Sequence, residues 1–121
     1  MDISVSAIHS GIEEMEKDAI FRRFRNGKLR CLVTTDSILF RGINFPQVNL
    51  VINFEMPNIY NKREQYYIQR IGKVSHFSRQ GVVINFELFD SNFIEEIEME
   101  YDIKIKELPE NLEELNKEIC L

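Results

Sequence analysis

The sequence predicts an α/β fold built on a mainly parallel sheet. Short apolar runs, typical of buried strands, alternate along the chain with longer segments of helical periodicity. Strands separated by helices form βαβ units, whose right-handed crossovers place neighbouring strands parallel. The length of 121 residues suits one small domain, and 44% apolar against 29% charged residues is typical of a soluble globular protein.

The first predicted elements are a strand and an amphipathic helix. Residues 3–8 alternate as a strand does. Ser10 and Glu13 have the spacing of a capping box, which predicts that a helix begins there. That helix should bury one face, made of Met15, Ala19, Ile20 and Phe24. A left-handed turn at Asn26-Gly27 should end it.

Three more strands and two more helices follow. Residues 31–35 and 48–54 are continuous apolar runs, which predict strands buried on both faces, and residues 81–86 predict a further strand. A helix is expected over residues 61–72, with Asn61 as its cap. Another should begin at Ser91 and carry apolar residues at Phe93, Ile94 and Ile97. Residues 103–105 alternate as an edge strand would, and an acidic helical stretch follows Pro109.

Several classes of protein and site are excluded by composition. No apolar run approaches the roughly 18 residues that span a bilayer, and no secretory signal opens the chain. Cys31 and Cys120 match no metal spacing, so an intracellular protein, cytoplasmic or nuclear, is expected. His9 has no second ligand at metal spacing and is interpreted as a packing or turn residue. The sequence contains no P-loop and no HExxH motif.

The charge is unevenly distributed. Residues 1–86 carry 12 Lys/Arg against 8 Asp/Glu, a net of +4, whereas residues 87–121 carry 3 against 12, a net of −9. A phosphate-binding surface is therefore expected in the first part of the chain. The acidic segment is interpreted either as a solvated helix face or as a surface for a protein partner.

Two polar segments follow predicted strand ends or helix ends, where parallel sheets place ligands. The first is Thr34-Thr35-Asp36 with the following residues 40–44, and it suits either a phosphate backbone or a simple turn with a solvated arginine. The second is residues 70–76, with Arg79 nearby, which fits either phosphate binding or a solvated basic helix end. A further basic stretch over residues 22–30 is either solubilising or in contact with phosphate.

The order of the segments carries a family resemblance. The segments are AIHSG, FRNG, LVTTD, RGIN, VNLVINFEMP, YIQRIG and GVVINF, at residues 7–11, 24–27, 32–36, 41–44, 48–57, 67–72 and 81–86. Together they resemble the second, C-terminal RecA-like domain of DEAD-box RNA helicases. The resemblance is nearest to the group of translation initiation factor 4A and its decapping and mRNA-export relatives. It covers about residues 4–110, and Leu108-Pro109 also resembles the family's terminus.

The resemblance implies a three-layer RecA-like domain over residues 1–110, without the family's first strand and helix, followed by an acidic tail over residues 111–121. It implies ATP as cofactor, with Mg held mainly by a first RecA-like domain that this sequence does not contain. The implied partners are RNA and that first domain, with no membrane. Hydrolysis of ATP by this chain alone is not expected.

On the RNA side, the resemblance assigns contacts to five positions: Lys17, Thr35, Asp36, Arg41 and Gly42. The family has a glutamine where this chain has Glu14, whose negative charge should repel phosphate.

On the nucleotide side, the resemblance assigns contacts to Asn44, Lys73 and His76. Lys73 and His76 occupy the positions of the family's arginine fingers, which stabilise charge on the transferring phosphoryl group. Lysine keeps the charge without the bidentate fork, and histidine is mostly neutral at pH 7. Gln69 and Arg70 fall on the family's interdomain positions.

The expected function is therefore that of a part of an ATP-dependent RNA helicase, which contributes RNA-backbone contacts and one side of the ATP cleft. The altered positions Glu14, Lys73 and His76 also fit an alternative. In that alternative the chain is a catalytically inactive pseudo-helicase module, which binds RNA or docks on a protein such as a helical-repeat scaffold.

Overall fold

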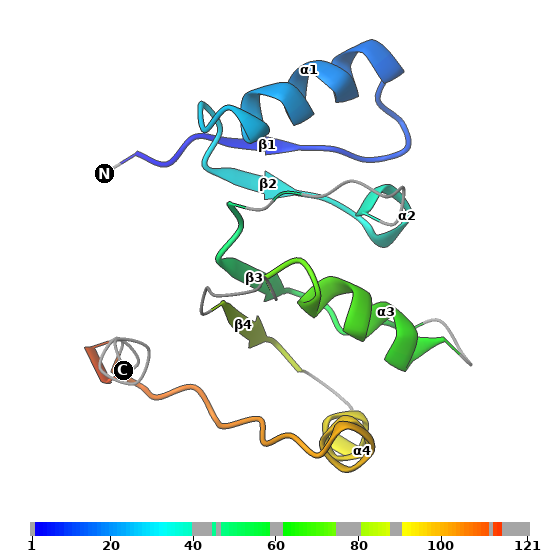
Figure 1. Ribbon diagram of the computed structural model, residues 1–121, viewed down its shortest axis with the longest axis vertical. Helices are drawn as coiled ribbons and strands as arrows, with labels where there is room; N and C mark the ends of the chain where they lie inside the picture. The colour runs from blue at the N-terminus through cyan, green and yellow to red at the C-terminus, as the bar shows by residue number, and fades with distance from the viewer. Residues whose placement is uncertain are drawn as a thin grey trace. The chain divides into compact units, whose positions relative to one another are not determined.

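The structure, a computed structural model, describes residues 2–39, 45, 47–58, 62–74, 81–87, 91–111 and 113–114. Strands and helices alternate through two compact units, Met1–Gln47 and Val48–Leu121, and each unit pairs two parallel strands (Figure 1). The predicted alternation of helices with parallel strands is confirmed.

The first unit contains β1 (Val5–Ala7), α1 (Glu14–Arg25), β2 (Cys31–Val33) and the short α2 (Asp36–Leu39). β1 and β2 pair with Val5 opposite Cys31 and Ala7 opposite Val33. The ladder continues past β1, because the backbone N–H of Ile8 donates to the carbonyl of Val33 at 2.8 Å. The core of this unit consists of buried aliphatic side chains from the two strand ends and both helices, namely Ile8, Ile20, Leu29 and Ile38.

The buried face of α1 differs from the predicted one at two of four positions. Ile20 is buried and Phe24 packs against the core, as predicted. Met15 is 83% exposed and Ala19 is exposed, so these two assignments were wrong. The face that is covered runs through residues 17, 20, 21 and 24, which is the i, i+3, i+4, i+7 stripe of a helix. The prediction failed because hydropathy alone selected Met15, whereas the aliphatic stem of Lys17 occupies this stripe.

The two ends of α1 test two sequence signals. The predicted capping box was wrong, because α1 begins at Glu14 and Glu13 is its N-cap, with no side-chain hydrogen bond at the cap. Ser10 lies in a turn before the helix. The predicted stop is confirmed: Asn26 is the C-cap, and Gly27 has φ +77°, a left-handed conformation that glycine adopts without steric cost.

The second unit contains β3 (Leu50–Asn53), α3 (Arg63–Ile71), β4 (Val82–Asn85) and α4 (Ser91–Tyr101). β3 and β4 pair in a parallel ladder that sets Val51 opposite Val83 and Asn53 opposite Asn85. The core residues Tyr67, Phe93 and Ile97 come from the two helices, which confirms Phe93 and Ile97 as buried positions of α4.

Three smaller predictions for the strands and helices have different outcomes. The strands are not buried on both faces, because Val33 is 54% exposed and Leu50 and Ile52 are also exposed. Residues 103–105 are described and form no strand; instead the backbone N–H of Ile105 donates to the Glu98 carboxylate at 3.2 Å. The predicted cap Asn61 lies outside the described residues, and Lys62 is the N-cap of α3.

Candidate functional site

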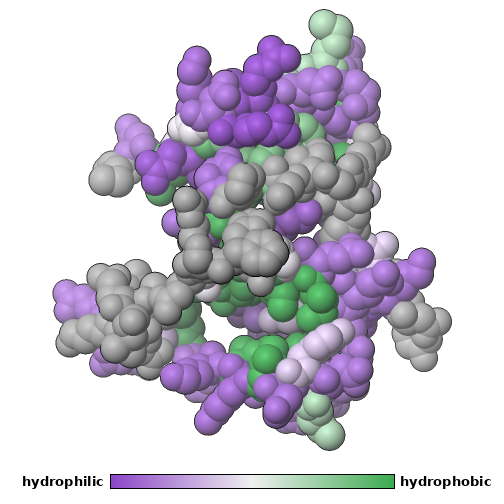
Figure 2. All heavy atoms as spheres, viewed as in Figure 1, coloured by the Kyte–Doolittle hydropathy of each residue, from purple (hydrophilic) through white to green (hydrophobic). Residues whose placement is uncertain are grey.

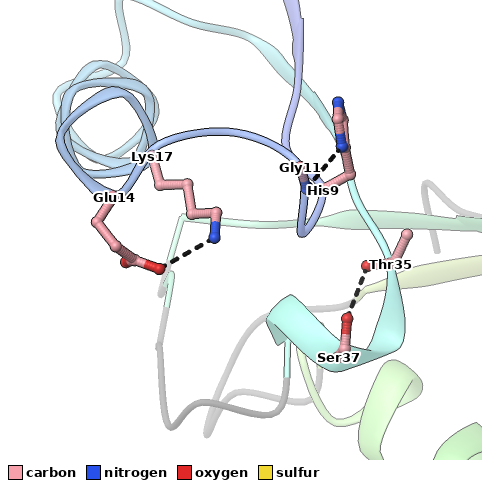
Figure 3. Close-up of polar contacts among 6 residues, drawn as sticks. All are labelled: His9, Gly11, Glu14, Lys17, Thr35 and Ser37. Atoms are coloured by element: carbon pink, nitrogen blue, oxygen red, sulfur yellow. Dashed lines mark hydrogen bonds and ion pairs between the residues drawn. The ribbon is translucent and has the colours of Figure 1, made fainter.

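A polar edge lies where β1 and β2 end, since parallel strands bring their carboxyl ends to one side. Thr34, Thr35 and Asp36 follow β2, and Asp36 is the first residue of α2. The hydroxyls of Thr35 and Ser37 lie 3.1 Å apart and share a hydrogen bond, and both side chains are exposed (Figure 3). This hydroxyl pair can offer donors and acceptors to phosphate oxygens or sugar hydroxyls. We call Thr35, Asp36 and Ser37 the hydroxyl edge.

Lys17 is placed differently from what a nucleic-acid contact requires. Its side chain is buried, with 5% exposure, and its ammonium group lies 3.0 Å from the carboxylate of Glu14, one turn earlier in α1 (Figure 3). Glu14 is mostly exposed. The cation is therefore neutralised within the helix in this structure, and its partner is the Glu14 carboxylate.

His9 has a local role in the turn after β1. Its Nδ1 accepts a hydrogen bond from the backbone N–H of Gly11 at 3.1 Å (Figure 3). A Cβ atom at Gly11 would lie 3.0 Å from the imidazole ring, so only glycine leaves enough space for the ring in this position. The interpretation of His9 as a turn residue is confirmed.

The basic stretch at the end of α1 lies on the solvent side of the helix. Arg22, Arg23 and Arg25 are exposed, and Figure 2 shows the visible face of α1 as mainly hydrophilic. The guanidinium of Arg25 lies 5.9 Å from the ring centroid of the buried Phe45. Arginines in the last turn also interact favourably with the helix dipole, so this stretch has a structural explanation in the helix itself.

A second polar cluster lies where α3 meets the carboxyl end of β3. The Nη1 atom of Arg70 donates to the carbonyl of Glu55 at 2.6 Å and to the side-chain oxygen of Asn53 at 3.3 Å. Gln69, its neighbour, is exposed, and Lys73 is half-buried just after the helix. The backbone N–H of Lys73 donates to the carbonyl of Arg70 at 3.2 Å, so the position of Lys73 depends on the end of α3.

Four of the expected site residues, Arg41, Gly42, Asn44 and His76, lie outside the described residues. Among the described ones, the structure brings Thr35 and Asp36 together in the first unit, and Arg70 and Lys73 together in the second. Nothing in the geometry assigns a ligand to Gln69.

The two asparagines at the centre of the second cluster were not predicted from the sequence. Asn53 is buried, and its Nδ2 donates to Oδ1 of Asn85 at 2.8 Å. The Nδ2 of Asn85 donates to the hydroxyl of Tyr67 at 3.0 Å. A signal was available: the tetrapeptide Val-Ile-Asn-Phe occurs at residues 51–54 and again at 83–86, and the strand register aligns its first three residues position by position.

Burial raises the pKa of the Tyr67 phenol above its ordinary value, and the hydrogen bond donated by Asn85 partly opposes this rise. The direction is expected, because a buried phenolate loses hydration, whereas a donor favours the charged oxygen. At neutral pH Tyr67 is therefore a neutral phenol that accepts a hydrogen bond.

Other kinds of site are not found in the part of the chain that the structure describes. No group of three or more His, Cys, Asp or Glu side chains there is arranged to hold a metal ion. None of the helices within the described ranges has the length and apolar character needed to cross a membrane. In α4, Glu95, Glu96 and Glu100 are exposed while Phe93 and Ile97 are buried, which supports a solvated acidic helix face in that segment.

Comparison with known proteins gives consistent matches. Residues 1–78 match the family described as "Helicase conserved C-terminal domain". Eukaryotic initiation factor 4A of Caenorhabditis elegans is 43% identical over 113 residues, which are 93% of this chain and 27% of that protein. The chain therefore spans little more than a quarter of the length of such relatives.

Solved structures agree in fold. S. cerevisiae Dbp5 bound to RNA and ADP BeF3 matches with a TM-score of 0.84 and 31% identity, over 97% of this chain and 31% of that one. The C-terminal domain of the DEAD-box protein Dbp5 matches with a TM-score of 0.78 and 31% identity, over 98% of this chain and 68% of that one. A variant of that domain has been solved bound to Gle1 and IP6, with a TM-score of 0.79, 31% identity and the same coverage.

Proposed function

Because this chain belongs to the helicase conserved C-terminal domain family, among its DEAD-box RNA helicases, we propose that it supplies RNA-backbone contacts and one side of the ATP cleft to an ATP-dependent RNA helicase. The observation that carries the RNA side is the exposed hydroxyl edge at the end of β2. It lies within the matched residues 1–78, in a fold shared with a relative solved with RNA.

Contacts to the RNA backbone suit the chemistry of the hydroxyl edge. The hydroxyls of Thr35 and Ser37 already share one hydrogen bond, and each retains capacity for a phosphate or ribose oxygen. Such contacts position a strand without reading its bases, as sequence-independent unwinding requires. Lys17 would join them only after it leaves Glu14, and Arg41 and Gly42 remain expectations outside the described residues.

On the nucleotide side, Lys73 is the described residue that fits an ATP phosphate. It is half-buried directly after α3, and an ammonium there would hold a phosphate oxygen as a point charge. ATP supplies the phosphoryl group whose transfer drives the helicase cycle. In our proposal Lys73 binds and orients that group, with less geometric control than the arginine found in the family. Asn44 and His76 would complete this side.

The RNA side is tested by fluorescence anisotropy of a labelled oligouridylate with the purified chain. Replacing both hydroxyl residues, in T35A/S37A, should weaken binding about thirtyfold, since two hydrogen bonds are lost and each contributes about 1 kcal/mol. The matched control T35S keeps a hydroxyl at the same position and should bind like the unmodified chain. Equal affinities for the double variant and the unmodified chain would contradict the RNA-binding role of the hydroxyl edge.

The nucleotide side is tested with the chain joined to a first RecA-like domain that carries a P-loop. Restoring the family's arginines in K73R/H76R should raise RNA-stimulated ATP hydrolysis, because guanidinium forks stabilise the transferring phosphoryl group better than an ammonium or a neutral imidazole. The chain alone should show no turnover. An unchanged rate in the double variant would mean that these positions do not limit hydrolysis.

A second candidate function is docking on a protein. It is favoured by a structure of the C-terminal domain of Dbp5 bound to Gle1, because that domain is similar in fold to this chain. In this alternative the chain is an inactive module, and Lys73 and His76 have lost their catalytic role. Affinity for RNA that is unaffected by T35A/S37A, together with no gain of turnover in K73R/H76R, would favour the docking module.

A further inference from the structure

A chain of hydrogen bonds between four side chains joins α3 to both strands of the second unit. Arg70 donates to Asn53, Asn53 donates to Asn85, and Asn85 donates to Tyr67, over distances of 3.3, 2.8 and 3.0 Å. We call these four residues the amide relay. Asn53 is buried, so this strand-end amide has its partners in the protein and not in solvent.

The relay has a single direction. A guanidinium has only donors, so Arg70 requires the carbonyl oxygen of Asn53 to face it. The NH₂ group of Asn53 must then face Asn85, which turns the oxygen of Asn85 toward Asn53 and its NH₂ group toward Tyr67. The arginine thus fixes the orientation of both amides, and the phenol accepts at the far end.

The relay also fixes α3 against the strand pair. Tyr67 and Arg70 stand three residues apart and so lie on one face of the helix, while Asn53 and Asn85 are opposite each other in the ladder. A rotation or a slide of α3 would break bonds at both ends of the relay. Arg70 adds a third attachment at the carbonyl of Glu55.

The segment after α3 is held by a backbone hydrogen bond to the end of the helix and by a close approach between Val74 and Gly81. Lys73 is bonded through its backbone to the carbonyl of Arg70, and Val74 is buried. A Cβ atom at Gly81 would clash with the Val74 side chain and would lie 2.7 Å from its carbonyl oxygen, so the two backbones approach closely before β4. The placement of Lys73 therefore depends on the end of α3.

From these contacts we infer that Tyr67, Asn85 and Asn53 are positioning residues. Together with Arg70 they hold α3 against β3 and β4, and so set where α3 ends and where Lys73 lies. Arg70 acts inside the unit, as the donor that orients the relay. The interdomain role that the family resemblance implies for Arg70 stays a prediction. The inference rests on the proposed function only in describing Lys73 as a nucleotide-side residue; the relay itself does not depend on it.

The test is nuclear magnetic resonance of the full chain labelled with ¹⁵N. Tyr67→Phe removes only the hydroxyl and keeps the ring, so a change at Arg70 cannot come from lost packing. We expect the guanidinium signals of Arg70, resolved in the unmodified chain, to broaden, and the amide signal of Lys73 to shift. The control Tyr101→Phe removes a hydroxyl from an exposed tyrosine at the end of α4, outside the relay, and should leave both signals in place.

Two outcomes would overturn the inference. The first is that Arg70 and Lys73 keep their signals in Tyr67→Phe. The second is that Tyr101→Phe moves them equally. If Tyr67→Phe does not fold, Asn85→Ala interrupts the relay at its middle and is read by the same two signals. Because no RNA or nucleotide is present, a negative result here is distinct from a failure of the proposed function.

Discussion

Removal of the Glu14 carboxylate should increase the affinity of this chain for RNA. In Glu14→Ala the ammonium group of Lys17 loses the partner that lies 3.0 Å away. Lys17 is only 4% exposed, and a buried ammonium group without a counter-charge has an unfavourable free energy. Its head group should therefore move into water while its aliphatic stem stays packed on the helix. The freed ammonium would then be available to a phosphate.

The size of the effect follows from counterion release. Each phosphate of a single strand that is neutralised contributes about 0.7 to the slope of log K against log salt concentration. One additional contact should therefore steepen the slope by about 0.7. At about 0.1 M salt, which is about tenfold below the roughly 1 M reference, this slope corresponds to binding that is stronger by about fivefold.

The assay is anisotropy of a labelled oligouridylate over a salt series. Glu16→Ala is the matched control, since it removes an equal charge from the same exposed turn without freeing Lys17. The additional variant E14A/K17A should lose the gain. Equal slopes for Glu14→Ala and Glu16→Ala would refute the reasoning, because the effect would then be one of net charge alone.

Three further predictions concern stability and are measured by urea unfolding. Arg63→Ala removes the cation 4.1 Å above the ring of Phe93 together with the hydrogen bond from its Nε to the carbonyl of Pro57 at 2.9 Å, and should cost about 1–2 kcal/mol, with Arg63→Lys recovering part of it. No loss would mean that the two contacts together are neutral. Gly81→Ala should cost about 1–3 kcal/mol because the new methyl group meets Val74, and an unchanged midpoint would contradict the close approach. Burial raises the folded-state pKa of Tyr67, so the neutral phenol contributes its full stabilisation below pH 10.0, and this stabilisation is lost as the pH rises through the raised pKa. Tyr67→Phe cannot ionise and should therefore lose less free energy of unfolding than the unmodified chain between about pH 9 and 11. Equal losses in the two proteins would refute the raised pKa of Tyr67.

Much of the fold could be predicted, because alternation of apolar runs with helical periodicity reports which backbone conformation a segment can adopt. The left-handed stop at Gly27 was predictable for a similar local reason, since glycine tolerates φ +77°. Details that depend on long-range contacts were not. The stripe of α1 includes Lys17, which no hydropathy scale would place there, and the cap at Glu13 makes no side-chain bond that a motif could reveal.

The candidate sites were predictable only in part. Thr35 and Asp36 were found because they follow an apolar run, and strand ends of parallel sheets gather polar groups. Ser37 was missed because its pairing with Thr35 depends on the turn into α2. The relay asparagines were missed because an asparagine inside an apolar run appears as an interruption, and its role becomes clear only once the register places Asn53 opposite Asn85.

The repeated tetrapeptide in β3 and β4 has a consequence for self-association. Two identical Val-Ile-Asn-Phe segments paired in parallel and in register have the geometry of two neighbouring strands in a cross-β fibril, in which stacked asparagines form an amide ladder. A β3 strand exposed by partial unfolding would find the same partner surface on the β3 of a second copy as it finds on its own β4. The aromatic rings of Phe54 and Phe86, with centroids 6.2 Å apart, would stack in the same way between copies. The bonds to Arg70 and Tyr67 therefore also hold the amides of Asn53 and Asn85 within one molecule, where they cannot join an amide ladder between copies.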